Sequence, residues 1–315
     1  MYDTINMRLY ADECKGASFF DDLPQRLTSA QLNANTATGE LWLDGRLDNL
    51  RIVANRYSMQ VKDGSLCKWY LGDNYQTLGK TDTRRAIERL CDTLLLPLER
   101  AQITRLDVAT NLIMTQPPEV YLSHLGALKY THRLAEPSGL YYTTKSKASR
   151  LAFYDKVRES TDKGDDIPEL YKGRYVLRYE QRYTKRIAQR LNRPELRAAA
   201  LYDDGLHREL VMRWREAYTQ IQKINEHTIN FTMVKTKKDF YKLGTLSLIE
   251  RAGGANEMLA QIAEARKAGQ IDSKQAFDLR AAVKEACKVD GEIVRESDAV
   301  KELDAKMAEA ARLYL

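Results

Sequence analysis

The sequence predicts an α+β fold, with an antiparallel sheet, helices on one face of that sheet, and a mostly helical C-terminal region. Segments with the period of two that is typical of strands flank the Asp-Gly pairs at 44–45 and 63–64, and Asp-Gly favours two-residue hairpin turns. Three later segments alternate in the same way. Beyond about Thr184 the apolar period becomes that of helices, which predicts the C-terminal region.

Length and composition narrow the class of protein. The chain has 315 residues, enough for two domains, which we place at residues 1–190 and 191–315. Its net charge of +6 is compatible with a nucleic-acid partner. The four cysteines are far apart, which predicts neither a disulfide framework nor a zinc site. No signal peptide or membrane-crossing segment is expected, so we expect a cytoplasmic protein.

The N-terminal third is predicted to be a meander of strands. Residues 2–10 alternate and form the first strand. A hairpin is expected over residues 40–54, turning at Asp44-Gly45, and a second over residues 57–71, turning at Asp63-Gly64.

Helices are predicted to follow the meander. Apolar residues recur at helical spacing from Asp82 to Leu96, with Asp82 or Thr83 as the N-cap. This helix would cover one face of the sheet and leave the other open. Another helix is expected over residues 119–128, after two prolines.

Three strand-like segments carry polar side chains along one face. These side chains are Arg105 and Asp107 in residues 104–109, Tyr154 and Lys156 in residues 150–159, and Arg178, Glu180 and Arg182 in residues 176–182. If the three strands lie in one sheet, two carboxylates meet a tyrosine and a lysine on that face. Two carboxylates suit a hard divalent cation such as Mg²⁺ or Mn²⁺. The alternative remains open that these are ordinary half-solvated strands.

Basic residues and tyrosines are interleaved from Lys145 to Arg190. Basic groups neutralise phosphates and aromatic faces stack on unpaired bases, although most of the tyrosines are expected in the core or at sheet edges. Residues 145–149 are either a phosphate-binding turn or a solvated hairpin tip. The candidate DNA-binding residues are Arg105, Lys145, Lys147, Arg150, Arg178 and Arg182.

The C-terminal region is predicted to be a set of helices separated by glycine breaks. The breaks are Gly253-Gly254, Gly269 and Asp290-Gly291, and the apolar stripe of one helix is Ala276, Leu279, Val283 and Cys287. Two helices joined through Gly269 could read DNA as a helix-turn-helix. We favour a helical hairpin used for docking or self-association.

The order of three motifs resembles that of a known family. The motifs are RLDVATN at 105–111, LAFYDKVRE at 151–159 and VLRYEQR at 176–182. They look like the rolling-circle replication initiators of filamentous phages, the gene II and gene X protein family. They are similar, more loosely, to Rep_trans plasmid initiators and to relaxases with the same HUH-like core. ELWLDGRL at 40–47 and the first strand fit too, so the resemblance covers about residues 1–190.

The resemblance implies a sequence-specific DNA endonuclease and strand transferase in residues 1–190. The roles carried over are Tyr154 as nucleophile, Lys156 as its neighbour at the scissile phosphate, Asp107 and Glu180 as acids binding Mg²⁺ or Mn²⁺, and Glu159 and Glu40 as further acidic positions. HUH nucleases hold their ion with a histidine pair, which this chain lacks.

The implied product is a 5′-phosphotyrosine and a free 3′-hydroxyl that a polymerase can extend. The implied partners are origin DNA, single-stranded or supercoiled, together with a host helicase and polymerase. A phenol with an ordinary pKa near 10 needs activation, which a metal ion and Lys156 would supply. Two alternatives remain open: a relaxase with the same chemistry, and a DNA-binding regulator without catalysis.

Overall fold

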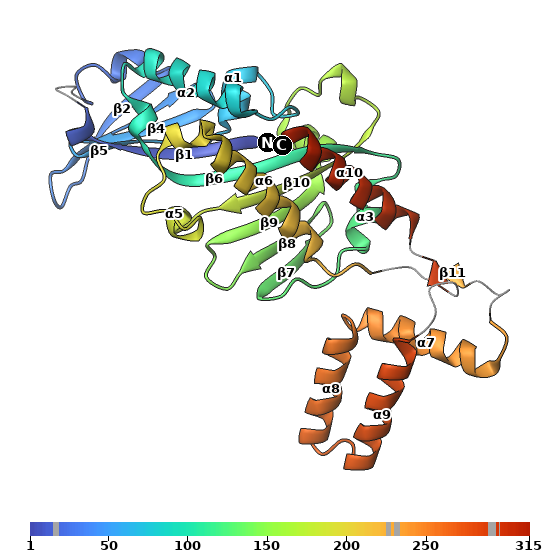
Figure 1. Cartoon of the computed structure of the whole chain (residues 1–315). Helices are drawn as coiled ribbons and strands as arrows, with labels where there is room; N and C mark the ends of the chain where they lie inside the picture. The colour runs from blue at the N-terminus through green and yellow to red at the C-terminus, as the bar shows by residue number, and fades with distance from the viewer. Residues whose placement is uncertain (15–18, 225–227, 230–233, 289–293, 296) are drawn as a thin grey trace. The chain divides into compact units, whose positions relative to one another are not determined.

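The computed structural model describes residues 1–14, 19–224, 228–229, 234–288, 294–295 and 297–315. The chain forms two compact units (Figure 1). The sheet unit comprises Met1–Ile113, Tyr130–Glu216 and Ala308–Leu315, and the helical unit comprises Met114–Lys129 and Ala217–Met307. The division therefore passes after Glu216 rather than at residue 190, and the last residues of the chain return to the sheet unit.

The sheet unit is built on a ten-stranded sheet, and the expected α+β class is confirmed. The spatial order is β2 (Ser29–Ala34), β3 (Leu41–Leu47), β4 (Leu50–Asn55), β5 (Ser58–Lys62), β1 (Tyr2–Tyr10), β6 (Gln102–Met114), β10 (Tyr175–Tyr183), β9 (Ser149–Asp155), β8 (Gly139–Thr144) and β7 (Thr131–Glu136). The predicted first strand matches β1. The β1–β6 and β9–β10 pairs are antiparallel.

The prediction of a turn at Asp44-Gly45 is wrong, because both residues lie inside β3. The chain turns four residues later, where Leu47 pairs with Leu50 and Asp48 takes a positive φ of 53°. Gly45 serves close approach rather than turning, since a Cβ there would lie 2.4 Å from the Ser29 carbonyl oxygen of the neighbouring strand.

The second predicted hairpin is also wrong, because the segment after β5 is helical. Ser65 caps α1 (Leu66–Leu71) by accepting a hydrogen bond from the Lys68 amide at 3.0 Å, and Gly72 ends the helix with a φ of 92°. A Cβ on Gly64 would lie 2.3 Å from the Asn49 carbonyl oxygen. The glycine of this Asp-Gly pair allows close packing just before the N-cap of a helix. The expected second strand of the hairpin therefore does not form.

Other helices lie close to their expected places. The helix α2 (Lys80–Leu94) begins two residues early, with Gly79 as N-cap in place of Asp82 or Thr83. The remaining helical elements of the sheet unit up to residue 202 are α4 (Lys156–Lys163), α5 (Ile187–Arg190), and the 3₁₀ turns η1 (Ala11–Glu13), η2 (Pro24–Arg26), η3 (Leu98–Arg100), η4 (Glu169–Tyr171) and η5 (Ala198–Tyr202).

Helix α6 (Asp204–Thr219) covers the apolar face of the central strands. Phe153 and Tyr179 lie opposite each other in β9 and β10, and their rings stack with centroids 4.4 Å apart. The Tyr179 ring lies 4.9 Å from that of Trp214 in α6, and its hydroxyl donates to the Trp214 carbonyl at 3.0 Å. Because side chains alternate along strands, the neighbours of Phe153 and Tyr179 point to the opposite face, as predicted.

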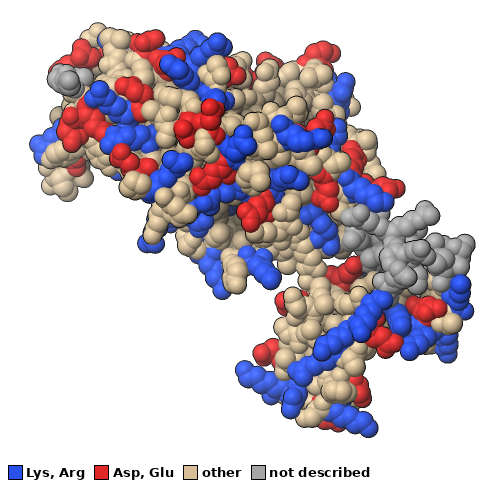
Figure 2. Space-filling view, in the orientation of Figure 1, with Lys and Arg blue, Asp and Glu red and all other residues tan. Residues whose placement is uncertain are grey.

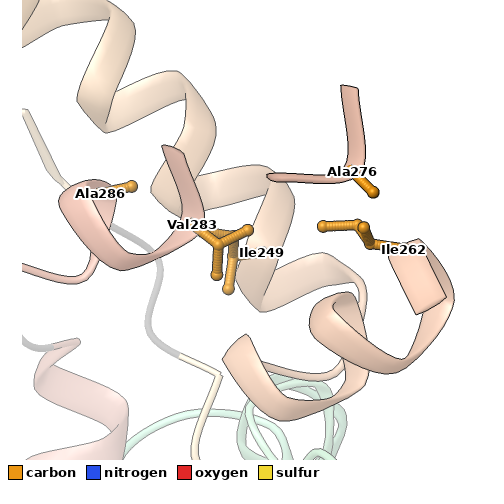
Figure 3. Close-up of a cluster of buried hydrophobic side chains, with 5 residues drawn as sticks. All are labelled: Ile249, Ile262, Ala276, Val283 and Ala286. Atoms are coloured by element: carbon orange, nitrogen blue, oxygen red, sulfur yellow. The ribbon is translucent and has the colours of Figure 1, made fainter. Parts of the chain in front are cut away.

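The helical unit has its own small core (Figure 3). Its described elements are α3 (Pro118–Ser123), β11 (Thr228–Ile229), α7 (Lys237–Arg251), α8 (Ala255–Lys267), α9 (Ser273–Ala286), β12 (Val294–Arg295) and the first part of α10 (Asp298–Tyr314). Helix α3 is thus shorter than the expected residues 119–128. The core cluster contains Ile249, Ile262, Ala276, Val283 and Ala286.

Two of the three predicted glycine breaks and the helical hairpin of this unit are confirmed. Gly253 and Gly254 separate α7 from α8, and Gly269 lies between α8 and α9 with a φ of 72°. The apolar stripe is partly wrong, because Leu279 is 45% exposed and Cys287 is exposed. The break expected at Asp290-Gly291 falls outside the described residues.

Acidic and basic side chains are interspersed on the sheet unit (Figure 2). The face in view shows Lys and Arg next to Asp and Glu in many places rather than one continuous basic field. Local clusters of charge are therefore a better guide to a binding site on this protein than the net charge is.

Candidate active site

The three strands that carry the polar motifs are neighbours in the sheet. β6, β10 and β9 follow one another near its centre, so the condition stated from the sequence, that the three strands lie in one sheet, is met. Arg178 lies opposite Tyr154 and Glu180 opposite Ala152 in the β9–β10 register. Directly opposed residues of an antiparallel pair share a face, so Tyr154, Arg178 and Glu180 lie together on the face that α6 does not cover.

A cleft of about 830 Å³ opens over this polar face. The residues of the predicted site that line it are Tyr154, Asp107, Glu180, Glu159, Arg105 and Arg182. Lys68 from α1 and Lys163 from α4 lie at its walls, and Lys68 is paired with Asp165 at 2.5 Å. The cleft lining is therefore mostly polar, with acids and bases facing one space.

Tyr154 lies near the end of β9 and is bonded to an acid. Its side chain is largely buried, and its hydroxyl donates to Glu180 Oε1 at 2.5 Å. Burial and the negative charge of Glu180 raise the pKa of the Tyr154 phenol well above its ordinary value. In this arrangement the tyrosine keeps its proton and the carboxylate stays ionised.

The prediction that Lys156 shares a strand face with Tyr154 is wrong, because β9 ends at Asp155 and Lys156 is the first residue of α4. Asp155 ends the strand by capping the helix, its carboxylate accepting from the Val157 amide at 2.9 Å. Lys156 is buried and donates to Glu159 Oε2 at 2.6 Å.

The buried amine of Lys156 is also perturbed. Burial and the positive charge of Arg178 lower the pKa of Lys156, although the Glu159 carboxylate acts against them. The Lys156 ammonium lies 5.2 Å from the ring centre of Tyr75. Lys156 is not among the residues that line the cleft, whereas its partner Glu159 is.

Glu180 is held by two arginines as well as by the tyrosine. Arg178 Nε donates to Oε1 and Arg182 Nε to Oε2, each at 2.6 Å. Burial alone would raise the pKa of Glu180, but the charges of Arg178 and Arg182 outweigh it and hold this pKa well below its usual range.

Asp107 lies on β6 and is paired with Arg105 from the same strand. Arg105 Nε and Nη2 donate to the two carboxylate oxygens at 3.0 Å and 2.5 Å, and Arg182 lies 3.7 Å away. Burial raises the pKa of Asp107 to about 6, even though both arginines and the hydrogen bond from Arg105 lower it. Asp107 and Glu180 are therefore linked through Arg182.

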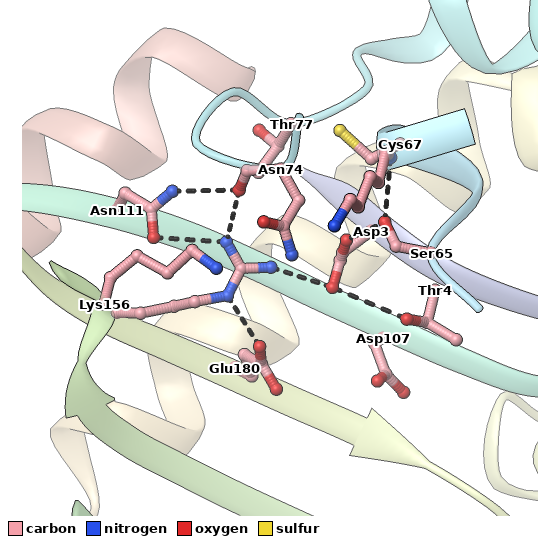
Figure 4. A network of polar contacts seen from close by, with 12 residues as sticks. Asp3, Thr4, Ser65, Cys67, Asn74, Thr77, Asp107, Asn111, Lys156 and Glu180 are labelled. Carbon is pink, nitrogen blue, oxygen red and sulfur yellow. Dashed lines mark hydrogen bonds and ion pairs between the residues drawn. The ribbon is translucent and has the colours of Figure 1, made fainter. Parts of the chain in front are cut away.

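Arg178 is fully buried and makes several polar contacts. Figure 4 shows the network to which its partners Asp3, Asn74, Asn111 and Glu180 belong. Besides Glu180, its guanidinium contacts Asp3 at 2.8 Å and donates to the Asn74 carbonyl at 2.9 Å and to the Asn111 side-chain oxygen at 3.1 Å. The network joins β1, β6 and β10 with the segment before α2. These contacts hold the Glu180 carboxylate in place at the cleft.

Sequence reasoning missed Asp3, although a signal was present. Asp3 is 5% exposed, and Ser65 donates to its carboxylate at 2.5 Å. In the alternating run of β1, Asp3 falls in line with the apolar Ile5 and Met7. An acid on the apolar side of a strand is costly to bury without a partner, so it indicates a buried ion pair.

The other predicted residues are placed away from this centre. Glu40 is exposed, accepts a hydrogen bond from Asn55 at 3.4 Å, and does not line the cleft. Lys145 and Lys147 lie at the exposed β8–β9 turn. The Arg150 guanidinium lies 4.0 Å from the ring centre of Tyr141.

The donor set suits a hard cation, but arginines engage its carboxylates. Asp107 and Glu180 supply the oxygen ligands that Mg²⁺ and Mn²⁺ prefer, and both face the cleft. Arg105 hydrogen-bonds Asp107, and Arg182 pairs with Glu180. Within the described part of the chain, no group of three or more His, Cys, Asp or Glu is arranged to hold a metal ion.

Comparison with known proteins identifies the family. A family model for the N-terminal part of a phage replication-associated protein, the gene II protein, matches residues 1–217. Among curated proteins, none matches the chain closely enough to count as a relative. The family match covers more than half of the chain and includes all three polar motifs. The chain therefore belongs to this family of filamentous-phage gene II-type proteins, as the motifs suggested, and its role is that of a rolling-circle replication initiator.

Proposed function

We propose that the chain nicks one strand of its origin DNA with Tyr154 as the nucleophile, forming a covalent 5′-phosphotyrosine and leaving a 3′-hydroxyl primer. One observation carries this proposal. The Tyr154 hydroxyl lies 2.5 Å from Glu180, a carboxylate aligned by two arginines, in a cleft of about 830 Å³. A tyrosine hydroxyl next to an oriented proton acceptor, with cations for a phosphate nearby, suits phosphoryl transfer.

The step conserves atoms and charge. The Tyr154 oxygen attacks phosphorus, the bond from phosphorus to the 3′ oxygen breaks, and that oxygen takes a proton from solvent. The phenol proton moves toward Glu180. Because the pKa of Tyr154 is raised and that of Glu180 is lowered, free phenolate is unfavourable. Proton transfer must therefore accompany formation of the new bond.

The positions of the arginines control how readily Glu180 accepts this proton. Among the arginines that hold the two acids, Arg105 and Arg182 are the more accessible, with side chains 30% and 25% exposed, whereas Arg178 is fully buried. A DNA phosphate can replace a carboxylate as the partner of either exposed arginine. Movement of Arg182 to the phosphate would remove a charge that lowers the pKa of Glu180, and so make Glu180 a better base.

We also propose that a divalent cation, Mg²⁺ or Mn²⁺, takes part, held by Asp107 and Glu180. Its contribution would be to neutralise charge on the non-bridging oxygens of the phosphate. Of the two further acidic positions that the resemblance implies, Glu159 lines the cleft and Glu40 does not. Lys156 is a positioning residue in this proposal, because its ammonium holds Glu159.

The remaining proposals concern partners. The 3′-hydroxyl would be extended by a host polymerase while a host helicase separates the strands. The DNA would be a single-stranded or supercoiled origin, contacted by Arg105, Arg150, Arg182 and the turn that carries Lys145 and Lys147. For the helical unit we propose docking, self-association or accessory DNA binding.

The decisive variant is Tyr154→Phe, which removes the nucleophilic oxygen and little else. Nicking and the covalent adduct should fall below detection, by at least about 10³-fold, because no other group replaces the lost oxygen. DNA affinity should change little. The measurement is a denaturing gel of labelled origin DNA mixed with protein and Mn²⁺ or Mg²⁺.

The matched control is Tyr175→Phe, which removes a hydroxyl from an exposed tyrosine of β10. It should nick like the wild type. Nicking at the wild-type rate by Tyr154→Phe refutes the assignment of the nucleophile. Binding without cleavage by the wild type, across metals and origin substrates, would favour the non-catalytic regulator.

A further inference from the structure

A second concave site lies where the β8–β9 turn meets the residues that follow β10. Its volume is about 490 Å³. The residues that line it are Ser146, Ala148, Lys185, Arg186, Gln189 and Arg190. Three of the six are cationic, two carry neutral hydrogen-bonding groups, and the described lining includes no Asp or Glu. Such a composition selects an anion.

Hydrogen bonds that do not involve the cationic side chains hold the two segments of the pocket together. The Thr184 amide donates to the Ala148 carbonyl, and the Thr184 hydroxyl donates to the Lys147 carbonyl, each at 3.0 Å. Ile187, the first residue of α5, is 4% exposed, so the start of this helix is anchored in the core. The β8–β9 turn and the start of α5 are therefore fixed to each other before any ligand binds.

The pocket lies at the far end of the strands that carry the candidate nucleophile. β9 runs from Ser149, beside the pocket, to Tyr154 and Asp155 at the cleft. Five residues of a strand span about 17 Å. That length corresponds to about five nucleotides of a helical strand, which carries one phosphate per about 3.4 Å of axis.

Two arginines lie on β9 and β10 toward the pocket from Tyr154 and Glu180. Arg150 and Arg182 are opposite each other in the β9–β10 register, so they share a face of the sheet. Arg182 follows Glu180 by two residues and lines the cleft. Cationic side chains thus lead from the cleft along the two strands toward the pocket.

We propose that this pocket binds a backbone phosphate of the DNA strand, some nucleotides away from the one in the cleft. The inference rests on the proposed function, because it takes the strand to pass through the cleft. Lys185 and Arg190 supply charge, while the Ser146 hydroxyl and the Gln189 amide can donate to phosphate oxygens. The pocket sets the register of the strand without reading its bases.

The test is Lys185→Gln combined with Arg190→Gln in the Tyr154→Phe chain, so that cleavage plays no part. Binding of fluorescent oligo-dT and of a random duplex, each of about 25 nucleotides per strand, is followed by anisotropy over a range of KCl concentrations without added metal. For two lost contacts, the slope of log affinity against log salt should fall by about 1.4 on the single strand, or by about 1.8 on the duplex. Affinity at low salt should fall about tenfold or more.

The matched control is Arg84→Gln with Arg85→Gln on the exposed side of α2, which changes the net charge equally. If its slope and affinity equal those of the pocket variant, the pocket assignment is overturned. The exchange variant with Lys185→Arg and Arg190→Lys keeps both charges and should bind normally. Loss of binding by this exchange variant would show that the substitutions disturb the fold rather than remove phosphate contacts. That result would count against the assignment.

Failure of the nucleophile and failure of the pocket give different results. If the wild-type chain forms no covalent adduct and the pocket variant loses salt-dependent affinity, the proposed chemistry is refuted and the proposed pocket is supported. A wild-type chain that forms the adduct, while the pocket variant binds like the control, supports the chemistry and refutes the pocket.

Discussion

Arg178 shows how one buried residue organises the candidate site. Its guanidinium contacts two acids from different strands, Asp3 and Glu180, and two acceptors near the sheet. A buried charge of this kind is costly unless every partner is in place. The same contacts leave Glu180 little freedom, so the acceptor for the Tyr154 proton is held in one orientation. Preorganisation of this kind is what phosphoryl transfer requires.

Metal dependence is tested at the two acids. Asp107→Ala or Glu180→Ala should lower metal-dependent nicking by about 10²-fold or more, because each change removes a proposed ligand. Glu40→Ala should retain activity, because Glu40 does not line the cleft. The measurement is the rate of nicking in Mn²⁺ or Mg²⁺ and in excess EDTA. Wild-type nicking that persists in EDTA would exclude the metal proposal.

His207 should make stability depend on pH. Burial lowers the pKa of His207, although its Nε2 lies 3.0 Å from the Tyr314 carbonyl oxygen, which acts in the other direction. The unfolded chain takes up a proton near pH 6.5, whereas the folded chain takes it up only at lower pH. Below about pH 6.5 the unfolded state therefore binds more protons, and stability falls as pH falls.

This pH dependence is measured by urea unfolding at about pH 7.5 and about pH 5.5. His207→Gln should lose less stability than the wild type over this interval, because the titrating group is gone. His132→Gln, at an exposed position of β7, should behave like the wild type. An unchanged pH dependence in His207→Gln would exclude His207 as the cause.

At the scale of elements, the junction between β9 and α4 determines what the cleft contains. Asp155 caps α4 through the Val157 amide, so the strand ends one residue after Tyr154. The tyrosine stays on the sheet face, whereas Lys156 turns into the helix and pairs with Glu159. A single cap residue thus separates two side chains that strict alternation would have placed together.

The helical unit depends on a few buried side chains. Ile249 is 2% exposed in the cluster formed by α7, α8 and α9. Ile249→Ala should lower the free energy of unfolding of this unit by about 2–5 kcal/mol, because it leaves a cavity. Leu248→Ala, at a side chain 62% exposed, should change it by less than about 0.5 kcal/mol. Hydrogen exchange of the α7–α9 amides measures both, and equal effects would contradict the assigned core.

At the scale of the whole molecule, the family match and the two units support different statements. The match ends at residue 217, next to the end of the second segment of the sheet unit at Glu216. The match therefore covers most of the sheet unit together with Met114–Lys129 of the helical unit, and the role of the rest of the helical unit remains a proposal. Within the described residues, no helix has the length and apolar character needed to cross a membrane.

Local patterns predicted much of the fold. β1, α2, β10 and the α8–α9 hairpin lie close to their expected places, because the period of apolar residues reports which side of an element is buried. The two Asp-Gly pairs misled for a physical reason. Gly45 and Gly64 are needed where another backbone approaches closely, and sequence alone does not distinguish this use of glycine from a turn.

The sequence by itself determined which side chains share a strand face, with the exception of Lys156, and the order of its motifs indicated the family. Alternation follows from local backbone geometry, so Tyr154, Asp107 and Glu180 could be found on polar faces without knowing the fold. Only the tertiary structure decided which strands are neighbours and that Arg178 joins Glu180 to Asp3. Contacts between distant segments depend on the order of the strands in the sheet, and no local pattern encodes that order.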